Sequence, residues 1–112
     1  MTDDCLFCKI LAREVPAEIV YEDDDVLAFN DIYPKAPFHV LIIPKKHIAT
    51  LNDLEDSDTK LAGMLFTAAK KIAVEQGFAD DGYRMMMNCG EGGGQIIFHM
   101  HLHLMAGKTF QA

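Results

Sequence analysis

Residues 99–104, His-Met-His-Leu-His-Leu, alternate histidine with a large apolar side chain. Successive side chains of a β-strand point to opposite faces, so this segment predicts a strand that buries Met100, Leu102 and Leu104 on one face. The opposite face then carries three imidazoles spaced about 6.6–7 Å apart along the strand. Imidazole serves at neutral pH as a metal ligand, a proton carrier or a nucleophile. A purely structural strand more often carries Thr, Val or Tyr at such positions, so we interpret this histidine row as a chemical site.

The composition indicates one globular domain over residues 1–112 and restricts its partners. Half of the residues are apolar, and a chain of this length buries about two-thirds of its unfolded surface without the help of disulfides or metals. The formal net charge of −7 argues against a nucleic-acid polymer as partner, because duplex affinity comes largely from Lys and Arg. A small phosphate ligand remains compatible with this charge, since backbone N–H groups and imidazoles can bind it.

The lack of a recognisable targeting signal and the cysteine usage predict a cytoplasmic protein. No apolar run approaches 18 residues, and the start Met1-Thr2-Asp3-Asp4 has neither the basic nor the apolar region of a leader. We therefore expect no membrane span. The chain has three cysteines, an odd number, and nothing suggests export, so we expect no disulfide framework.

Apolar periodicity and turn residues predict an α+β fold. The expected elements are a short helix at 7–13, strands at 19–21, 26–29 and 39–43, a long helix from 56 or 57 to 76, and strands at 83–88 and 96–105. Gly77 is a natural stop for the long helix. Short loops join the first three strands into an antiparallel meander, and the long helix then returns the chain to two more strands. The prediction is a five-stranded antiparallel sheet with a short N-terminal helix and one long helix on one face.

The loop at residues 89–95, Cys-Gly-Glu-Gly-Gly-Gly-Gln, comes immediately before the histidine row. Glycines permit positive φ angles and let an anion approach backbone N–H groups. The loop is not a P-loop, because no Gly-Lys-Ser/Thr follows. A flexible hairpin turn is the simpler interpretation of the glycines alone. Their position, however, places N–H donors beside the imidazoles.

Two further features have both a chemical and an ordinary interpretation. Cys5 and Cys8 form a CxxC motif, which occurs in redox pairs, in zinc sites and in protein cores. The N-terminus lacks the βαβ context of a redox pair, whereas His47 and the histidine row offer the imidazoles of a tetrahedral zinc site. Asp31 follows the second strand, where its carboxylate can accept hydrogen bonds from ribose hydroxyls or form a turn. The residues alone leave these alternatives open.

Residues 99–105 match the His-φ-His-φ-His-φ-φ signature of the histidine-triad (HIT) family, where φ is apolar. The chain resembles the Hint branch of this family, the nucleotide-binding phosphoramidases. The resemblance covers nearly the whole chain, because segments 29–32, 36–39, 43–48, 82–85 and 93–95 stand in the expected order and spacing. It implies a single HIT domain.

The resemblance also implies a reaction, the hydrolysis of a purine nucleoside phosphoramidate or acyl-nucleotide. His101 corresponds to the nucleophile that attacks the α-phosphorus and forms a covalent nucleotidyl-histidine, which water cleaves to the nucleoside monophosphate. One ring nitrogen of His101 is expected to meet a backbone carbonyl of the same strand. His103 and His39 correspond to imidazoles that contact the phosphate and the leaving group, where as cations they would offset phosphoryl charge.

Nucleotide-binding residues and a homodimer follow from the same resemblance. Asp31 corresponds to the ribose-binding carboxylate. The other implied positions are an apolar slot for the base, formed by Phe7, Ile10, Phe29 and Ile32, and a phosphate cradle at Asn88, Gly94, Gln95 and Ile96. The family commonly has Ser or Thr at the position of Ile96. Members of the family form two-fold dimers through their long helices and fourth strands, and we expect the same here.

Bacterial relatives with an N-terminal CxxC motif bind zinc through positions that correspond to Cys5, Cys8, His47 and His99. The resemblance therefore implies a structural zinc ion, and four protein ligands leave no open position for Lewis-acid catalysis. Two other functions remain as alternatives. One is a nucleotide-binding regulatory or scaffold protein with weak or vestigial catalysis, motivated by Ile96 and by a chain that ends at Ala112, before the tail of Hint enzymes. The other is a metallohydrolase with its metal on the histidine row.

Overall fold

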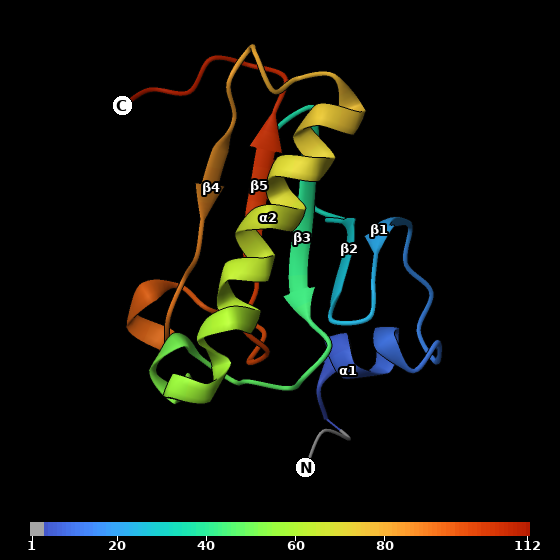
Figure 1. Ribbon diagram of the computed structural model, residues 1–112, viewed down its shortest axis with the longest axis vertical. Coiled ribbons are helices and arrows are strands. Elements are labelled where there is room, and N and C mark those ends of the chain that lie inside the picture. The colour runs from blue at the N-terminus through green and yellow to red at the C-terminus, as the bar shows by residue number, and fades with distance from the viewer. Residues whose placement is uncertain (1–3) are drawn as a thin grey trace.

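The computed structural model describes residues 4–112, so positions 1–3 of the predicted leaderless start lie outside the described residues. Its centre is an antiparallel sheet with strand order β1-β2-β3-β5-β4 (Figure 1). The strands are β1 (Ile19–Glu22), β2 (Val26–Asn30), β3 (Phe38–Pro44), β4 (Arg84–Met86) and β5 (Leu102–Ala106); the helices are α1 (Leu6–Leu11) and α2 (Thr59–Gln76). Short 3-10 turns occupy Leu51–Asp53, Asp56–Asp58 and Glu91–Gly93. The predicted fold class is confirmed.

The sheet separates two apolar layers. Alternate residues of β2 and β3 divide between them, because side chains of a strand point to opposite faces. The α2-side cluster contains Val26, Ala28, Val40, Ile42, Ile48, Leu65, Ala68, Ala69, Ile72, Met100, Leu102 and Leu104. The α1-side cluster contains Phe7, Ile10, Leu27, Phe29, Leu41 and Ile43. α2 runs across the face of the sheet in front of β3 and β5 (Figure 1).

Helix α2 ends where the sequence predicts and begins slightly later. Gly77 adopts φ +84° and donates its N–H to the carbonyls of Ala73 and Val74, which terminates the helix. At the other end, a 3-10 turn occupies Asp56–Asp58, so the α-helical hydrogen bonds begin at Thr59. No helix within residues 4–112 combines the length and apolarity needed to cross a membrane.

The prediction of a strand over 96–105 is wrong for its first half. β5 begins at Leu102, so His103 lies on the strand while His99 and His101 lie in the irregular segment before it. The main chain of this segment has other partners: the Met100 N–H donates to the Ile48 carbonyl at 2.6 Å, and the His99 carbonyl accepts from the His101 ring at 2.8 Å. The alternation of faces nevertheless persists, because Met100 and Leu102 both pack in the α2-side cluster.

Candidate functional site

The histidine row faces the α1 side of the sheet. His103 on β5 pairs with Leu41 on β3, and Leu41 belongs to the α1-side cluster. His39 lies two residues before Leu41 on the same face of β3. The ring centroids of His39 and His103 are 5.2 Å apart, and those of His101 and His103 are 5.1 Å apart. Three imidazoles from two neighbouring chain segments thus form one continuous group.

Hydrogen bonds to the main chain fix the tautomer of His101. Its Nδ1 lies 2.8 Å from the His99 carbonyl oxygen, which only accepts, so Nδ1 carries the proton. Nε2 therefore holds a lone pair in the neutral ring, which is the form of imidazole that attacks an electrophile. The backbone carbonyl expected as the partner of His101 is present. The His101 residue keeps 8% of its surface exposed.

The tautomer of His39 follows from a different main-chain group. The Lys35 N–H donates to His39 Nδ1 at 3.0 Å, so the proton of the neutral His39 ring is on Nε2. His39 Nε2 then donates to His103 Nδ1 at 2.9 Å, which leaves His103 with its proton on Nε2. The Asp31 carboxylate lies 3.5 Å from His39 Nε2 and accepts the Tyr33 N–H at 2.8 Å. The site therefore offers one nucleophilic nitrogen, on His101, and one N–H donor, on His103.

Burial keeps these rings neutral. Desolvation lowers the pKa of His39 and of His101, although the Asp31 carboxylate acts in the opposite direction on both. For His103, burial and then the neighbouring His101 and His39 lower the pKa to about 4. For His39 and His103, this neutral state differs from the cationic one that the resemblance implied. The cost of burying charge outweighs the attraction of the nearby carboxylate.

A second group of side chains forms the Cys/His cluster, which consists of Cys5, Cys8, His47 and His99. Its four donor atoms, two Sγ and two Nδ1, all lie within 4.8 Å of one another. His99 Nε2 lies 2.8 Å from the Pro44 carbonyl and donates to it, so His99 Nδ1 directs a lone pair into the cluster. Burial lowers the pKa of His99 to about 4, which favours this neutral ligand form. All five histidines of the chain thus belong to one of two adjacent groups.

The spacing within the Cys/His cluster fits a tetrahedral metal ion. Ordinary zinc–nitrogen and zinc–sulfur bond lengths place ligand atoms about 3.3 Å apart for two nitrogens and about 3.5 Å apart for nitrogen and sulfur. Here the two Nδ1 atoms of His47 and His99 are 3.2 Å apart. The sulfur–nitrogen separations are 3.2 Å for Cys8 and His47, 3.4 Å for Cys5 and His99, and 3.5 Å for Cys8 and His99. The Cys8 N–H also donates to Cys5 Sγ at 3.3 Å. The cluster can therefore hold a metal.

Asp31, His39 and His103 also bring ligand-type atoms within 4.8 Å of one another. Their hydrogen bonds argue against a metal there. His39 Nε2 could bind a metal only after its proton moved to Nδ1, and Nδ1 already accepts the Lys35 N–H. This geometry disfavours the metallohydrolase alternative, since His39 and His103, the imidazoles beside the carboxylate, are arranged as a hydrogen-bonded chain.

The residues predicted for the base slot divide into two groups. Phe7, Ile10 and Phe29 are buried in the α1-side cluster, whereas Ile32 keeps 80% of its surface exposed. The Phe7 and Phe29 rings meet edge-on at 5.3 Å between centroids. The structure therefore places three of these side chains in the apolar layer beneath the site and only Ile32 at the surface.

The residues predicted for the phosphate cradle also differ in their roles. The buried Gln95 side chain accepts the Gly90 N–H at 2.8 Å and donates to the carbonyls of Ala49 and Ile97 at 2.8 and 3.0 Å. Through these bonds, the side-chain amide of Gln95 connects the glycine loop to the segment after β3. Asn88 Nδ2 donates to the Gly93 carbonyl at 2.7 Å.

Two other cradle positions have distinct conformational features. Gly94 adopts φ +86°, a conformation that favours glycine. Ile96 is 85% exposed, so this side chain is available to a ligand at the surface. The main-chain partners of the site, at Lys35, Pro44 and Ile48, could not be found from side-chain motifs, because any residue type provides the same carbonyl and N–H groups.

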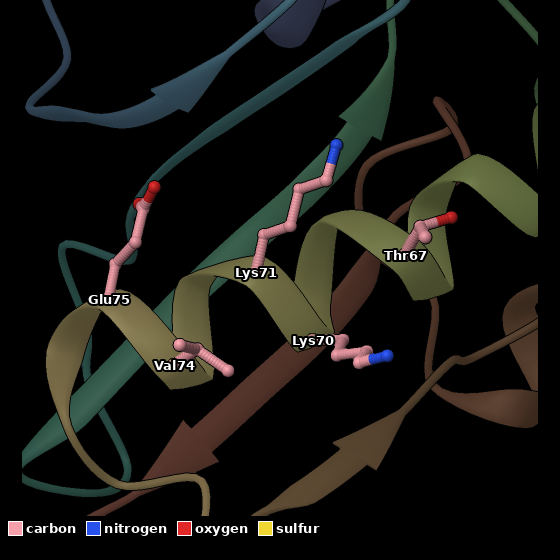
Figure 2. Close-up of a pocket in the computed structure, with 5 residues that line it drawn as sticks. All are labelled: Thr67, Lys70, Lys71, Val74 and Glu75. Carbon is pink, nitrogen blue, oxygen red and sulfur yellow. The ribbon is translucent and has the colours of Figure 1, made fainter.

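Residues 4–112 also form hollows that lie outside the histidine groups, including the following two. One of about 280 Å³ lies on α2 and is lined by Thr67, Lys70, Lys71, Val74 and Glu75, whose side chains Figure 2 shows projecting from the helix. The other, of about 520 Å³, is lined by residues 81–85 and 108–112. Neither lining contains an imidazole or a thiol, so neither competes with the histidine row as a site of chemistry.

Comparisons with known proteins identify related sequences. The sequence model of a family described as "Scavenger mRNA decapping enzyme C-term binding" matches residues 4–111. A protein of Escherichia coli strain K12 named purine nucleoside phosphoramidase is 47% identical over 108 residues, which cover 96% of this chain and 91% of that protein.

Solved structures of similar sequence share the fold of this chain. A HIT family hydrolase from Legionella pneumophila has a TM-score of 0.94 at 51% identity and covers 96% of each chain. A histidine triad protein from Clostridium difficile has a TM-score of 0.95 at 46% identity and covers 98% of this chain and 96% of that one. On this evidence of sequence, fold and site, the chain belongs to the histidine-triad family.

Proposed function

We propose that this protein hydrolyses purine nucleoside phosphoramidates or acyl-nucleotides at the α-phosphate, through a covalent nucleotidyl intermediate on His101. The observation that supports this function most strongly is the hydrogen bond from His101 Nδ1 to the His99 carbonyl, which leaves Nε2 as a nucleophile. The relative named purine nucleoside phosphoramidase shares 47% of its aligned residues with this chain, which supports the same substrate class.

In the first step, His101 Nε2 attacks the α-phosphorus, and the bond from phosphorus to the leaving nitrogen or acyl oxygen breaks. The ring becomes cationic when it is nucleotidylated, and its Nδ1–H keeps the His99 carbonyl as acceptor. The dipole of that carbonyl stabilises the charge. In the second step, water attacks phosphorus and breaks the bond to Nε2. Over both steps one water molecule provides the proton of the leaving group and the hydroxyl of the nucleoside monophosphate.

His103 stabilises the phosphoryl group as a neutral donor. Its Nε2–H is the free end of the chain that begins at the Lys35 N–H and passes through His39. A neutral N–H donor preorganised toward the phosphoryl oxygens strengthens as charge accumulates on them. Backbone N–H groups of the glycine loop, with Asn88 and Gly94, complete the cradle for the phosphate.

The rest of the nucleotide occupies the surface between Asp31 and the α1-side cluster. Asp31 accepts hydrogen bonds from the ribose hydroxyls while its turn is held by the Tyr33 N–H. The base lies against the exposed Ile32, above the layer formed by Phe7, Ile10 and Phe29. Ile96 lies at the leaving-group side and provides apolar contact without a hydroxyl.

The metal of the Cys/His cluster is zinc in this proposal. Two thiolates and two neutral imidazoles form a charge-balanced structural site, and zinc bound there stabilises the fold by joining α1 to the segments around His47 and His99. The reduced thiols that such a site needs agree with a cytoplasmic location.

We also propose a homodimer, formed through α2 and β4. Within residues 4–112, β4 pairs on one side only, with β5, so its other edge has backbone groups available for a partner strand. Met85 and Met86 on this strand are 40% and 39% exposed, and Phe66 on α2 is 53% exposed. A second copy would cover this apolar surface and extend the sheet.

A second candidate function is nucleotide binding with weak or vestigial catalysis. The exposed Ile96 favours it, because an apolar side chain there cannot donate a hydrogen bond to a leaving amine. Incubation with an adenosine phosphoramidate separates the two functions. We expect release of AMP by the protein and none by His101→Ala. Tight AMP binding without AMP release would establish the second function, and turnover that survives His101→Ala would exclude the role of His101.

A further inference from the structure

We propose that the Cys/His cluster positions the nucleophile: a metal bound there orients the peptide unit between His99 and Met100, and this unit holds the ring of His101. The inference rests on the proposed function, since it assigns a role relative to the His101 nucleophile. It names His99 and Phe7 as positioning residues for that reaction.

One peptide unit is the centre of this arrangement. Its carbonyl, from His99, accepts the His101 Nδ1–H at 2.8 Å. Its N–H, from Met100, donates to the Ile48 carbonyl at 2.6 Å. A peptide unit is planar, so these two bonds together fix the direction in which the carbonyl points. The tautomer of His101 therefore depends on how firmly the segments at residues 48 and 99 are held relative to each other.

The Cys/His cluster joins those same two segments. Ile48 directly follows His47, and the Nδ1 atoms of His47 and His99 face each other at 3.2 Å. A metal coordinated by both nitrogens links the segment at residues 47–48 to the segment at residues 99–100. These two segments are the ones that the hydrogen bonds of the peptide unit join. The other nitrogen of His99 donates to the Pro44 carbonyl at 2.8 Å, so the ring is held at both ends once the metal is bound.

Phe7 provides a second connection between the cluster and the nucleophile. It lies between Cys5 and Cys8 in sequence, and its ring contacts His101 edge-on, with centroids 5.1 Å apart and planes at 85°. The same ring lies 6.0 Å from His99 and is 3% exposed. α1 has only six residues, too few for a helix to be stable alone. Packing in the α1-side cluster and metal coordination at Cys5 and Cys8 therefore together hold Phe7 against His101.

Loss of the metal should release His101 without displacing the sheet. Without the link between His47 and His99, the Met100 N–H would still reach the Ile48 carbonyl, but the His99 carbonyl would no longer be held toward His101 Nδ1. Phe7 would lose the part of its support that comes from Cys5 and Cys8. Both neutral tautomers of His101 would then be populated. The tautomer with its proton on Nε2 has no lone pair there and cannot attack phosphorus.

The test compares zinc-loaded and zinc-stripped protein by long-range ¹⁵N–¹H NMR of the histidine rings at pH 8. We expect one neutral tautomer for His101 with zinc, protonated at Nδ1, a mixture after zinc is removed, and recovery on adding zinc back. In parallel, kcat should fall about 10–100-fold with little change in KM. A single unchanged tautomer in stripped protein whose circular dichroism shows an intact fold would overturn the proposal.

Phe7→Leu keeps all four metal ligands and tests the second connection even if the stripped protein unfolds. We expect full zinc content, a mixed His101 tautomer and a lower kcat. Leu11→Ala is the matched control, because Leu11 lies on the same helix and packs on the same cluster, yet makes none of the ring contacts of Phe7. A change in KM alone in Phe7→Leu, or equal effects in both variants, would contradict a positioning role. The NMR result does not depend on turnover. A protein that shows the expected tautomer change but no hydrolase activity would refute the proposed function and leave the positioning role in place.

Discussion

His39 donates a hydrogen bond from Nε2 to Nδ1 of His103 across 2.9 Å. The direction of this bond follows from the Lys35 N–H, which occupies the other nitrogen of His39. A neutral His103 therefore presents an N–H, while a neutral His101 presents a lone pair. Two histidines of one row thus have opposite roles, and the difference comes from main-chain groups rather than from the ring type.

Replacement of His103 removes this donor. We expect His103→Ala to lower kcat about 10²–10³-fold on an adenosine phosphoramidate, the usual loss for one preorganised donor to a developing oxyanion, with a smaller change in KM. Steady-state kinetics of the zinc-loaded proteins measures this. Lys60→Gln, an exposed change on α2, serves as the control. A kcat within two- to three-fold of the unmodified protein would show that His103 does not stabilise the transition state.

Stability should fall as the pH falls below the ordinary histidine pKa. The unfolded chain binds protons on His39 and His103 as the pH passes about 6.5, whereas burial lowers the folded-state pKa of both, to about 4 for His103. The free energy of unfolding therefore decreases between pH 6.5 and about 4 and gains nothing further from these groups above about pH 7. Of the groups that act on His103, Asp31 opposes this shift, and Lys35 reinforces it.

Urea unfolding at several pH values tests this dependence at constant zinc loading. His103→Gln lacks one of the contributing groups and should show a shallower decrease over the same interval. Carboxylates such as Glu22, whose pKa is lowered by Lys45 and Arg13, lose their contribution only at more acidic pH. Identical slopes for the two proteins between pH 6.5 and 5 would be inconsistent with a neutral, buried His103.

Protein purified without added metal should contain about one zinc ion per chain. Cys5→Ser removes one thiolate, so we expect it to lose most of the zinc and to melt at a markedly lower temperature, because zinc binding contributes to folding. Cys89→Ser, which alters the cysteine outside the Cys/His cluster, should keep both. Elemental analysis and thermal unfolding provide the readouts. A full zinc content in Cys5→Ser would exclude the cluster as the metal site.

Light scattering at micromolar concentration should give the mass of a dimer. Phe66→Lys places a charge on the exposed apolar surface of α2, and Met86→Lys does so on β4. We expect both variants to shift the protein toward monomer, because an unpaired charge in an apolar interface is costly. Lys60→Gln should leave the mass unchanged. A monomer in the unmodified protein would refute the proposed dimer.

Periodicity predicted which face each side chain of residues 99–104 uses, but not the hydrogen bonds of the main chain. Alternation correctly placed Met100 and Leu102 on one buried face, because local sterics and hydrophobic burial determine it. The structure shows that this face is the α2 side. The predicted start of β5 was wrong, because the Met100 N–H donates to the Ile48 carbonyl, about fifty residues away in the chain, instead of pairing in the sheet. Such a partner depends on the assembled fold and has no local pattern.

Gln95 illustrates the same limit for the site. The resemblance implied a place in the phosphate cradle, and the structure adds that its side-chain amide bonds the main chain of Gly90, Ala49 and Ile97. The Cys/His cluster was easier to predict, because metal ligands must be Cys, His or carboxylate and the resemblance gave their positions. The protonation state of His39 and His103 could not be predicted from the sequence, because it depends on burial and on one N–H from Lys35.

The covalent step at His101 is tested most directly by intact-protein mass spectrometry after brief mixing with an adenosine phosphoramidate, followed by acid-free peptide mapping. We expect a mass increase of one adenylyl group on the peptide that contains His101, absent in His101→Ala and lost with time as AMP appears. AMP released at full rate with no adduct on any histidine, or an adduct on a different residue, would contradict this step.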